Sequence, residues 1–409
     1  MTAVQRAVAD AHRREWATVL AATVRVTRDI DLAEECVQDA YVAALDTWTR
    51  GGVPARPGAW LIVTARHHAV DALRRATTLR SKLHLLVEPV VAEPDVPDDP
   101  VVQHDRLRLV FLCCHPALAC EAQVALTLRL VCGLSTADIA AAFLVSETTM
   151  AARITRAKKK IVQARIPFRM PSRAELPERL DAALTAIHLL FSTGHTAPSG
   201  PTLTRDELAG HALDLARLLH RLMPDEREVR GLLALLLTGH ARRGTRIDAD
   251  GRLLLLAEQD RSAWDSWAIA EAHDLVVAAL RGGNPGRFAL QAAIASLHAS
   301  APVYADTDWK QILVLYDELL VSWPSPVVAL NRAVAVAMVR GPAVALSEVE
   351  ALEAAGRLAG YRYLPAIKAD LLRRLARHRD AAVEYERALT LADNDAERAF
   401  LTRRLAGLD

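Results

Sequence analysis

Residues 132–161 constrain the fold of this chain more than any other segment. They read CGLSTADIAAAFLVSETTMAARITRAKKKI, two short amphipathic stretches separated by Leu144 and Val145. Ser135 and Ser146 each precede one stretch, at a position where a serine hydroxyl accepts a hydrogen bond from an amide of the first helical turn. The pattern predicts two helices joined by a tight turn, which is a helix-turn-helix.

Apolar residues at helical spacing predict how these two helices pack. On the first helix, alanines beside the larger side chains allow a close helix crossing. On the second, the apolar residues leave a polar face on the other side. The residues expected to face inward are Ile139, Ala140, Phe143, Met150, Ala151 and Ile154.

The second helix continues into a basic tail, opposed nearby by one acid, Glu147. Its cations are Arg153, Arg156, Lys158, Lys159, Lys160 and Arg165. A helix with such a polar face fits the major groove of DNA, which is about 12 Å wide. The alternative is a surface helical hairpin with a solvated charged face. The joint presence of caps, turn and basic tail favours the DNA-binding interpretation.

The order of residues along the second helix predicts which part of DNA each one meets. Early residues of such a helix reach base edges, and later ones reach phosphates. We therefore expect Glu147, Thr148 and Thr149 at bases, and Arg153 at a base or a phosphate. The full set of expected contacts to duplex DNA is Ser146, Glu147, Thr148, Thr149, Arg153, Arg156 and Lys159, the last two at phosphates.

Composition indicates a large helical protein with no overall charge preference. With 409 residues, 52% of them hydrophobic, the chain is too long for one ordinary domain and can bury sizeable cores. Only 5% of its residues are aromatic, and alanine, leucine, valine and arginine are abundant. It has 50 Lys and Arg residues against 49 Asp and Glu residues, so any contact with nucleic acid must come from local patches.

The sequence has no segment typical of a membrane or secreted protein. No apolar run approaches the roughly 18 residues that a membrane span needs. The first residues, MTAVQRAVADAHRREW, lack the apolar stretch of a signal peptide. We therefore expect a cytoplasmic protein with no membrane partner.

Five cysteines raise the question of a zinc site. They are Cys36, Cys113, Cys114, Cys120 and Cys132. An odd number in a long cytoplasmic chain argues against a disulfide framework. Cys113 and Cys114 are adjacent to each other, and no second pair follows to complete a tetrahedral site. We expect small buried thiols near a helix end, and no metal or other cofactor.

Loops divide the first part of the chain into blocks. Residues 8–78 are expected to form a first helical block, interrupted by a Gly- and Pro-rich loop at 49–58. Residues 79–100 are acidic and rich in proline, which predicts a linker. Residues 101–166 are expected to form a second helical block that contains the helix-turn-helix.

The composition changes after Pro167. Residues 175–409 are almost continuous amphipathic helix, which makes the whole chain all-α by expectation. Two segments near the end look like tetratricopeptide hairpins, and Ala382, Tyr385 and Ala388 would be the crossing contacts of the second. The expected breaks between helices are 192–202, 241–252 and 281–286.

Three ordered motifs resemble those of the extracytoplasmic-function group of sigma-70 type RNA polymerase sigma factors. A family pattern like D-x-x-D-L-V-Q-D-x-F is similar to residues 31–41 here, DLAEECVQDAY. A helix pattern that begins W-L and ends D-x-L-R-R is similar to residues 60–75. The family's helix-turn-helix pattern is met by residues 134–161. The resemblance covers residues 8–166, and a subset of the group is similar in carrying a tetratricopeptide-like C-terminal domain.

This resemblance implies a role for each block. The acidic helix would bind the polymerase core, and the helix that begins at Trp60 would bind the melted upstream promoter element, with cations on the DNA backbone. The implied contacts to core polymerase are Asp31, Glu34, Glu35, Gln38 and Asp39, clustered on exposed faces. The implied contacts to melted DNA are Arg56, Trp60, Arg66, His67, His68, Asp71, Arg74 and Arg75.

Some of these positions keep a second interpretation. His67 replaces an asparagine that helps the family read the melted element, so contact is retained and the sequence preference is open. Trp60 is also expected as a core residue, and Arg74 and Arg75 as partners of a helix C-terminus. The acidic linker either threads the polymerase interior, as in the family, or is a plain tether.

The sequence therefore predicts an initiation factor rather than an enzyme. Its histidines are scattered, and no nucleophile motif or glycine-rich phosphate loop occurs. The expected partners are core RNA polymerase, promoter DNA and a protein partner of the C-terminal part. The alternative is a stand-alone helix-turn-helix regulator with a ligand- or protein-sensing helical domain, and a third is a scaffold. The acidic motif favours the first, because a repressor needs no polymerase-binding helix.

Overall fold

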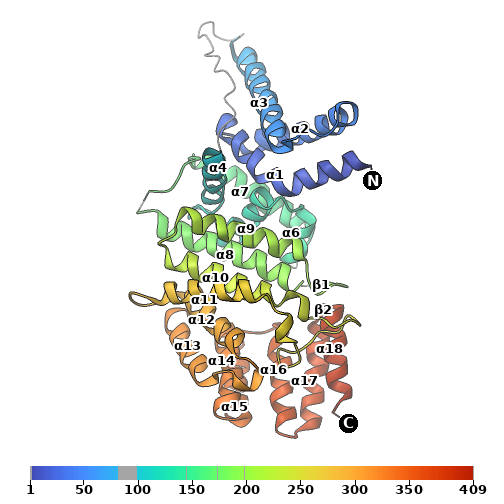
Figure 1. The fold of residues 1–409 in the computed structure, drawn as a ribbon, viewed down its shortest axis with the longest axis vertical. Coiled ribbons are helices and arrows are strands. Elements are labelled where there is room, and N and C mark those ends of the chain that lie inside the picture. The colour runs from blue at the N-terminus through green and yellow to red at the C-terminus, as the bar shows by residue number, and fades with distance from the viewer. Residues whose placement is uncertain (1, 82–98, 144, 173, 198, 409) are drawn as a thin grey trace. The chain divides into compact units, whose positions relative to one another are not determined.

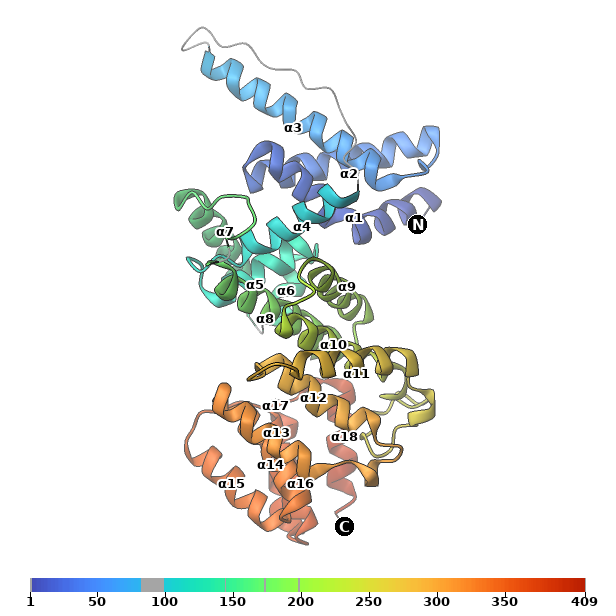
Figure 2. The ribbon, with the colours of Figure 1, turned by 60° about the vertical axis from the view of Figure 1, so that its left-hand side comes forward.

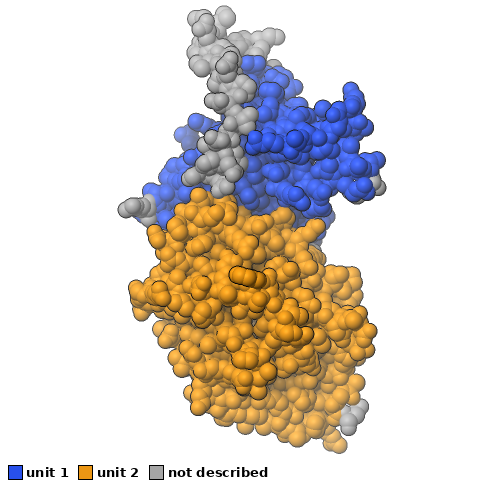
Figure 3. Space-filling view, viewed as in Figure 1, with its two compact units in different colours: residues 1–186 blue, residues 187–409 orange. Residues whose placement is uncertain are grey.

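A computed structural model describes residues 2–81, 99–143, 145–172, 174–197 and 199–408. In this part of the chain almost all regular structure is helical, which confirms the all-α prediction (Figure 1). The chain divides into two compact units, residues 1–186 and 187–409, which Figure 3 colours separately. None of the described helices is both long and apolar enough to cross a membrane.

The first unit consists of two groups of helices. Helices α1, α2 and α3 pack against one another, α4 packs against α1, and α7 packs against α5 and α6. The last helix of the unit, α8, continues into the second unit. The bounds are α1 (Ala3–Thr27), α2 (Ile30–Gly51), α3 (Pro57–Ser81), α4 (Asp99–Cys113), α5 (Cys120–Leu126), a π-helical turn η1 (Thr127–Val131), α6 (Thr136–Ala142), α7 (Glu147–Gln163) and α8 (Leu176–His195).

Short polar side chains fix where α6 and α7 begin. Ser135 Oγ accepts a hydrogen bond from Asp138 N at 3.1 Å, and Ser146 Oγ accepts one from Thr149 N at 3.2 Å. Each bond satisfies an amide that has no partner within its helix. The predicted helix-turn-helix is confirmed, with Val145 in the turn, while Leu144 lies outside the described residues.

The inner seam of α7 differs from the expected one by one residue. Met150 and Ile154 are buried as expected, and the seam continues through Ala157 and Ile161. These positions follow intervals of three and four residues, which keep to one face of a helix. Ala151 is exposed, so the expectation that it faces inward is wrong: it lies about 100° around the helix from Met150. On α6, Ile139 and Ala140 are buried and Phe143 is half-buried.

The predicted acidic linker falls mostly outside the described residues. Its first residues, 79–81, form the end of α3, and its last two, 99–100, begin α4. Residues 82–98 are not described.

The cysteines at the end of α4 are buried thiols, as expected. Cys113 and Cys114 are both fully buried, and Cys114 Sγ lies 3.5 Å from Thr127 Oγ1. Burial raises the pKa of the Cys113 thiol well above its ordinary value, so this thiol stays protonated. Among the described residues, no group of three or more His, Cys, Asp or Glu side chains is placed to hold a metal ion.

The second unit is a stack of helices in which each contacts the next along the chain from α9 to α18. Successive helices lie side by side in both ribbon views (Figure 1 and Figure 2). The bounds are α9 (Asp206–Leu222), α10 (Arg227–Ala241), α11 (Ser266–Leu280), α12 (Arg287–Ser300), α13 (Trp309–Ser322), α14 (Pro326–Val339), α15 (Pro342–Ala354), α16 (Tyr363–Arg374), α17 (His378–Leu391) and α18 (Asp395–Ala406), with short 3-10 turns at Arg243–Thr245, Arg261–Ala263 and Tyr304–Asp306 and strands β1 (Ser199–Gly200) and β2 (Asp393–Asn394).

The predicted crossing contacts of the last hairpin are partly confirmed. Tyr385 and Ala388 are buried in the core of the unit. Ala382 is half-buried, and Ala381 takes the fully buried position instead. The reason is the helical period, because positions 381, 385 and 388 fall on one face of α17.

A buried asparagine ties the last helix to an earlier loop. Asn394 Nδ2 donates to Thr202 O at 2.9 Å, and its Oδ1 accepts from the amides of Ala396 and Glu397 at the start of α18. Strand β2 pairs in parallel with β1, Ser199 opposite Asp393. Residues near the start of the second unit are therefore joined to residues near its end by backbone and side-chain hydrogen bonds.

Three partly buried histidines make the stability of the second unit depend on pH. Burial lowers the pKa of His188 to about 4, of His195 to about 3 and of His298 to about 4. In the unfolded chain each takes up a proton near pH 6.5. The free energy of unfolding should therefore be constant above about pH 6.5 and fall as the pH drops from there toward 4.

We predict that urea unfolding of the intact chain, followed by tryptophan fluorescence, has a lower midpoint at pH 5 than at pH 7.5. Each histidine should contribute about 2 kcal/mol of this difference, since its unfolded form takes up its proton over the 1.5 pH units between about 6.5 and 5. His298→Gln should remove its share, whereas substitution of the exposed His378 should leave the difference unchanged. Equal midpoints at the two pH values would contradict this account.

Candidate nucleic-acid and protein interfaces

The exposed face of α7 carries most of the residues expected at duplex DNA. Its first turn is held rigidly, because Ser146 Oγ also lies 3.0 Å from Thr148 Oγ1 and 2.8 Å from Thr149 Oγ1. The opposite face is the buried seam that begins at Met150. The exposed members of the expected set are Ser146, Glu147, Thr148, Thr149, Arg156 and Lys159.

Arg153 is placed differently from the other cations of this face. Its side chain is 21% exposed, and its Nη2 lies 3.1 Å from Glu121 Oε2. Its guanidinium also stacks over the ring of Phe143, 5.8 Å from the ring centre. The side chain is therefore drawn toward α5 and α6, and a contact with DNA would have to replace the Glu121 pair.

The residues expected at melted DNA lie along α3, except Arg56, which directly precedes it; the C-terminal half of α3 extends beyond α1 and α2 (Figure 1 and Figure 2). Arg75 Nε donates to Asp71 O at 3.3 Å, within the helix. The exposed members are Arg56, His67, Asp71, Arg74 and Arg75, and the half-buried ones are Trp60, Arg66 and His68.

Trp60 is shared between the core and the surface. Its ring meets the buried ring of Trp48 edge to face, with centres 5.6 Å apart. Such pairs add stability beyond the area they bury. Because Trp60 remains partly exposed, the structure fits its interpretation as a core residue while leaving part of the ring at the surface of α3.

The acidic face of α2 is exposed at four of its five expected positions. Asp31, Glu35, Gln38 and Asp39 are exposed. The same helix continues into two exposed apolar side chains, Val42 at 62% and Leu45 at 40% exposure. Acidic and apolar side chains together are typical of a protein interface, whose apolar centre is bordered by polar residues.

The expectation that Glu34 is exposed is wrong. Its side chain is 8% exposed and meets two cations of the second block of helices, Lys158 in α7 and Arg129 in η1. The physical reason is its position one residue after the buried Ala33, on the flank of the face that packs inward. A carboxylate at such a position stays charged only where cations compensate its loss of water.

Lys158 is the functional residue whose partner sequence reasoning missed. The sequence places Lys158 among the cations of the basic tail, but its Nζ donates to Asp31 Oδ1 at 2.8 Å and to Glu34 Oε2. Burial acts to lower the pKa of Lys158, but the hydrogen bonds that it donates to Asp31 and Glu34 raise it above the ordinary value. The one available signal was its spacing, because Lys158 follows Ala157 and lies four residues after Ile154, beside the inner seam.

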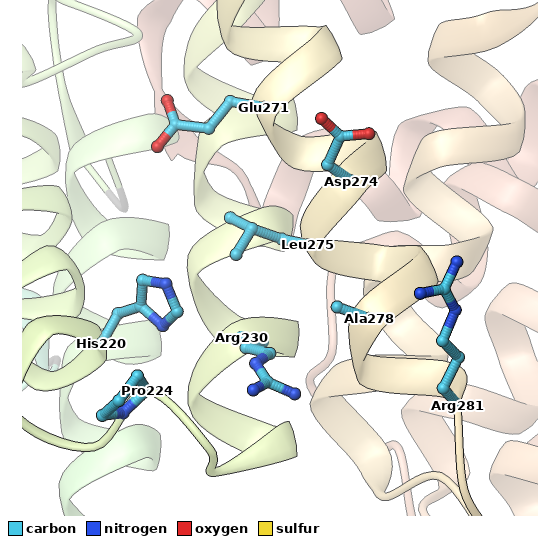
Figure 4. A pocket seen from close by; sticks show the side chains of 8 residues that line it. All are labelled: His220, Pro224, Arg230, Glu271, Asp274, Leu275, Ala278 and Arg281. Atoms are coloured by element: carbon cyan, nitrogen blue, oxygen red, sulfur yellow. The ribbon is translucent and has the colours of Figure 1, made fainter.

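The second unit has an open cavity of about 650 Å³ between α9, α10 and α11 (Figure 4). Its charges are separated: Glu271 and Asp274 lie toward one end, and Arg230 and Arg281 toward the other (Figure 4). The lining is completed by His220, Pro224, Leu275 and Ala278. Trp267, 87% exposed, stands one turn before Glu271 on α11. No motif in the sequence pointed to this site.

Comparison with known families assigns the two blocks of the first unit. Residues 11–78 match Sigma-70 region 2, and residues 108–161 match Sigma-70 region 4. Residues 179–280, which include the α9–α11 cavity, match a family of unknown function, DUF6596.

Two curated proteins are similar to this chain. An uncharacterized protein of Rhizobium meliloti is 44% identical over 391 residues, which is 94% of this chain and 92% of that protein. The ECF RNA polymerase sigma factor SigX of Bacillus subtilis is 24% identical over 144 residues, 34% of this chain and 69% of SigX. No solved structure matches.

The two region matches fall on the blocks that hold the acidic helix α2, the helix α3 and the helix-turn-helix. The similarity to the Rhizobium protein extends across the second unit as well. The chain therefore belongs to the sigma-70 family, as a factor of the extracytoplasmic-function type that carries an additional C-terminal domain.

Proposed function

We propose that the protein directs core RNA polymerase to promoters by using one surface for each partner. Helix α2 binds the core enzyme, α3 binds the melted upstream element, and α7 binds the duplex element. The observation that carries this proposal is the exposure of three chemically different faces on these helices, within the two matched sigma regions. Both partners place its action in the cytoplasm, and the role requires no catalytic chemistry from this chain.

The α2 face suits a basic protein partner. Glu35, Gln38 and Asp39 lie within one turn of each other on its exposed side, with Val42 next along the same stripe. Carboxylates attract and orient a basic surface, and the apolar side chain supplies area that leaves water on binding. A stand-alone regulator does not bind core polymerase and therefore requires no such surface.

The α7 face suits duplex DNA. Hydroxyls and a carboxylate lie at its start, where a helix in the major groove reaches base edges. Exposed cations follow at Arg156, Lys159, Lys160 and Arg165, where the helix leaves the bases and meets phosphates.

The α9–α11 cavity is the surface we propose for a protein partner of the C-terminal domain. A partner segment with a cation toward Glu271 and Asp274 and an acid toward Arg230 and Arg281 would match its charges. The exposed Trp267 supplies the large aromatic contact that dominates many interfaces. Such a partner contact would make the domain a requirement for activity rather than a removable inhibitor.

Reversing the charge of the α2 face should weaken binding to core polymerase. The double variant Glu35→Lys with Asp39→Lys places two cations opposite a basic partner, so the dissociation constant should rise about tenfold or more. Fluorescence anisotropy with purified core enzyme measures this, and circular dichroism checks the fold. The matched control is Glu350→Lys with Glu386→Lys, two exposed acids of the second unit. Equal affinity of the test variant and wild type would remove α2 from the proposal.

Replacing either of two arginines of α7 by alanine should weaken DNA binding, but in two different ways. Arg153→Ala should cost about 1–3 kcal/mol at one base pair and relax the preference there, if this side chain leaves Glu121 to read a base. Arg156→Ala should weaken binding to all promoters and reduce the dependence on salt by about one ion. Binding of both variants to a promoter series at several salt concentrations separates these effects. If both variants initiate transcription at the wild-type level, α7 does not bind the duplex element as proposed.

The C-terminal domain should be required for promoter-specific transcription, so deletion from about residue 175 should lower transcription and leave some DNA binding. Arg179 complicates this test, because it is buried in α8 and its Nη1 donates to Phe111 O at 3.2 Å. Substitutions in the intact chain keep this contact between Arg179 and Phe111.

Glu271→Lys with Asp274→Lys, or Trp267→Ala alone, should lower transcription from the cognate promoter severalfold. The control variant, Glu350→Lys with Glu386→Lys, should leave this transcription unchanged. Wild-type or raised transcription by the cavity variants, with the fold intact, would contradict a supporting role for this site.

A further inference from the structure

The two blocks of the first unit meet at a packed interface. Helix α1 of the first block contacts α4 and η1 of the second. Trp16, buried in α1, lies against Gly133, where an added Cβ would come within 3.1 Å of its ring. Beside it, Arg25 Nε lies 3.4 Å from the buried carboxylate of Asp105. These contacts hold the helix-turn-helix block close to the α1–α3 block.

An ion network at the edge of this interface joins the two faces to which the proposed function assigns different partners. The ammonium of Lys158, in α7, is bonded to Asp31 and Glu34 at the start of α2. Arg129 Nη2 lies 3.4 Å from the other oxygen of Glu34. Lys158 is 14% exposed and Glu34 is 8% exposed, so solvent and salt screen this network less than a surface ion pair.

The network and the assembly on polymerase exclude each other. While Lys158 holds Glu34, which is 8% exposed, this carboxylate cannot meet a basic partner, and the exposed Asp31 beside it shares the same ammonium. The same ammonium cannot serve the phosphates that its neighbours Arg156 and Lys159 are placed to meet. Asp31 and Glu34 thus take up a cation of α7 that would otherwise be available to a phosphate.

We propose that this ion network is a latch, which holds the free protein closed until core polymerase displaces Lys158 from α2. The latch rests on the proposed function, since it needs α2 as the polymerase-binding helix. Its occupant is a segment of this chain, the Lys158 turn of α7. The latch covers Glu34, engages Asp31 and leaves Glu35 and Asp39 exposed, so polymerase can begin to bind on the open part of the helix and then displace Lys158.

Carbodiimide cross-linking tests the contact directly, because this reagent joins an amine and a carboxylate only where they touch. In the free protein it should link Lys158 to Asp31 or Glu34, identified by mass spectrometry of the digest. Lys368, whose Nζ lies 2.7 Å from Glu353 Oε2 in the second unit, is the internal control. Adding core polymerase should abolish the Lys158 link and leave the Lys368 link. A Lys368 link without a Lys158 link in the free protein, or a Lys158 link that survives in the purified complex, would overturn the latch.

Affinity for core polymerase provides the second measurement. Lys158→Met keeps the length of the side chain and removes its charge, so it should tighten binding about tenfold if the wild type is closed roughly nine tenths of the time. Lys158→Arg, which keeps the cation, and Lys310→Met, which removes an exposed cation of the second unit, should bind as wild type does. Thermal melts followed by circular dichroism check that each variant is folded.

If wild type binds core polymerase and the folded Lys158→Met variant binds it no more tightly, the latch is overturned. If neither wild type nor any variant binds core polymerase, the proposed function itself fails, and the latch with it.

Discussion

Glu34 is a carboxylate with almost no access to water, and its charge is compensated from another part of the chain. Removing one partner of such a buried pair typically costs about 3–5 kcal/mol, because the other charge is left uncompensated. Lys158 and Arg129 supply the compensation, and both belong to the block that contains the helix-turn-helix. The position of the recognition helix relative to α2 in the first unit therefore depends on one acidic residue of α2, together with the Trp16 packing beside it.

This dependence links the stability of the first unit to its proposed role. In the proposed role the two blocks bind two separate promoter elements, whereas here helix α1 packs directly against α4 and η1. The residues of α7 and α3 to which we assign DNA are mostly exposed, while Asp31 and Glu34 of α2 are engaged by the chain itself. Binding energy from polymerase would thus be used both for recognition and for opening.

Local features of the fold could be predicted from the sequence. The caps at Ser135 and Ser146 and the seam through Met150 and Ile154 depend on residues a few positions apart, and the structure has them as expected. Of the three errors of burial, two concern alanines, Ala151 and Ala382, which are each one residue away from a buried methionine or alanine. Alanine fits either face of a helix, so the sequence pattern does not distinguish neighbouring positions.

Tertiary partners could not be predicted in the same way. Lys158 meets Glu34 across 124 residues of sequence, and Arg153 meets Glu121 across a helix boundary. The sequence does not show which of the neighbouring lysines 158–160 is buried, because that depends on how the two blocks of helices pack. The cavity lined by Arg230 and Glu271 brings together α9, α10 and α11, whose sequences show only ordinary amphipathic helices.

Reconstituted transcription with purified core enzyme decides whether this chain gives RNA polymerase its promoter specificity. Genomic DNA fragments are transcribed with and without the protein, and the 5′ ends of the transcripts are sequenced. We predict that discrete start sites occur only when the protein is present, each at a fixed distance from a shared pair of upstream elements. Sequence-specific DNA binding by the protein without polymerase, and no new start sites with it, would identify a stand-alone regulator and contradict this role.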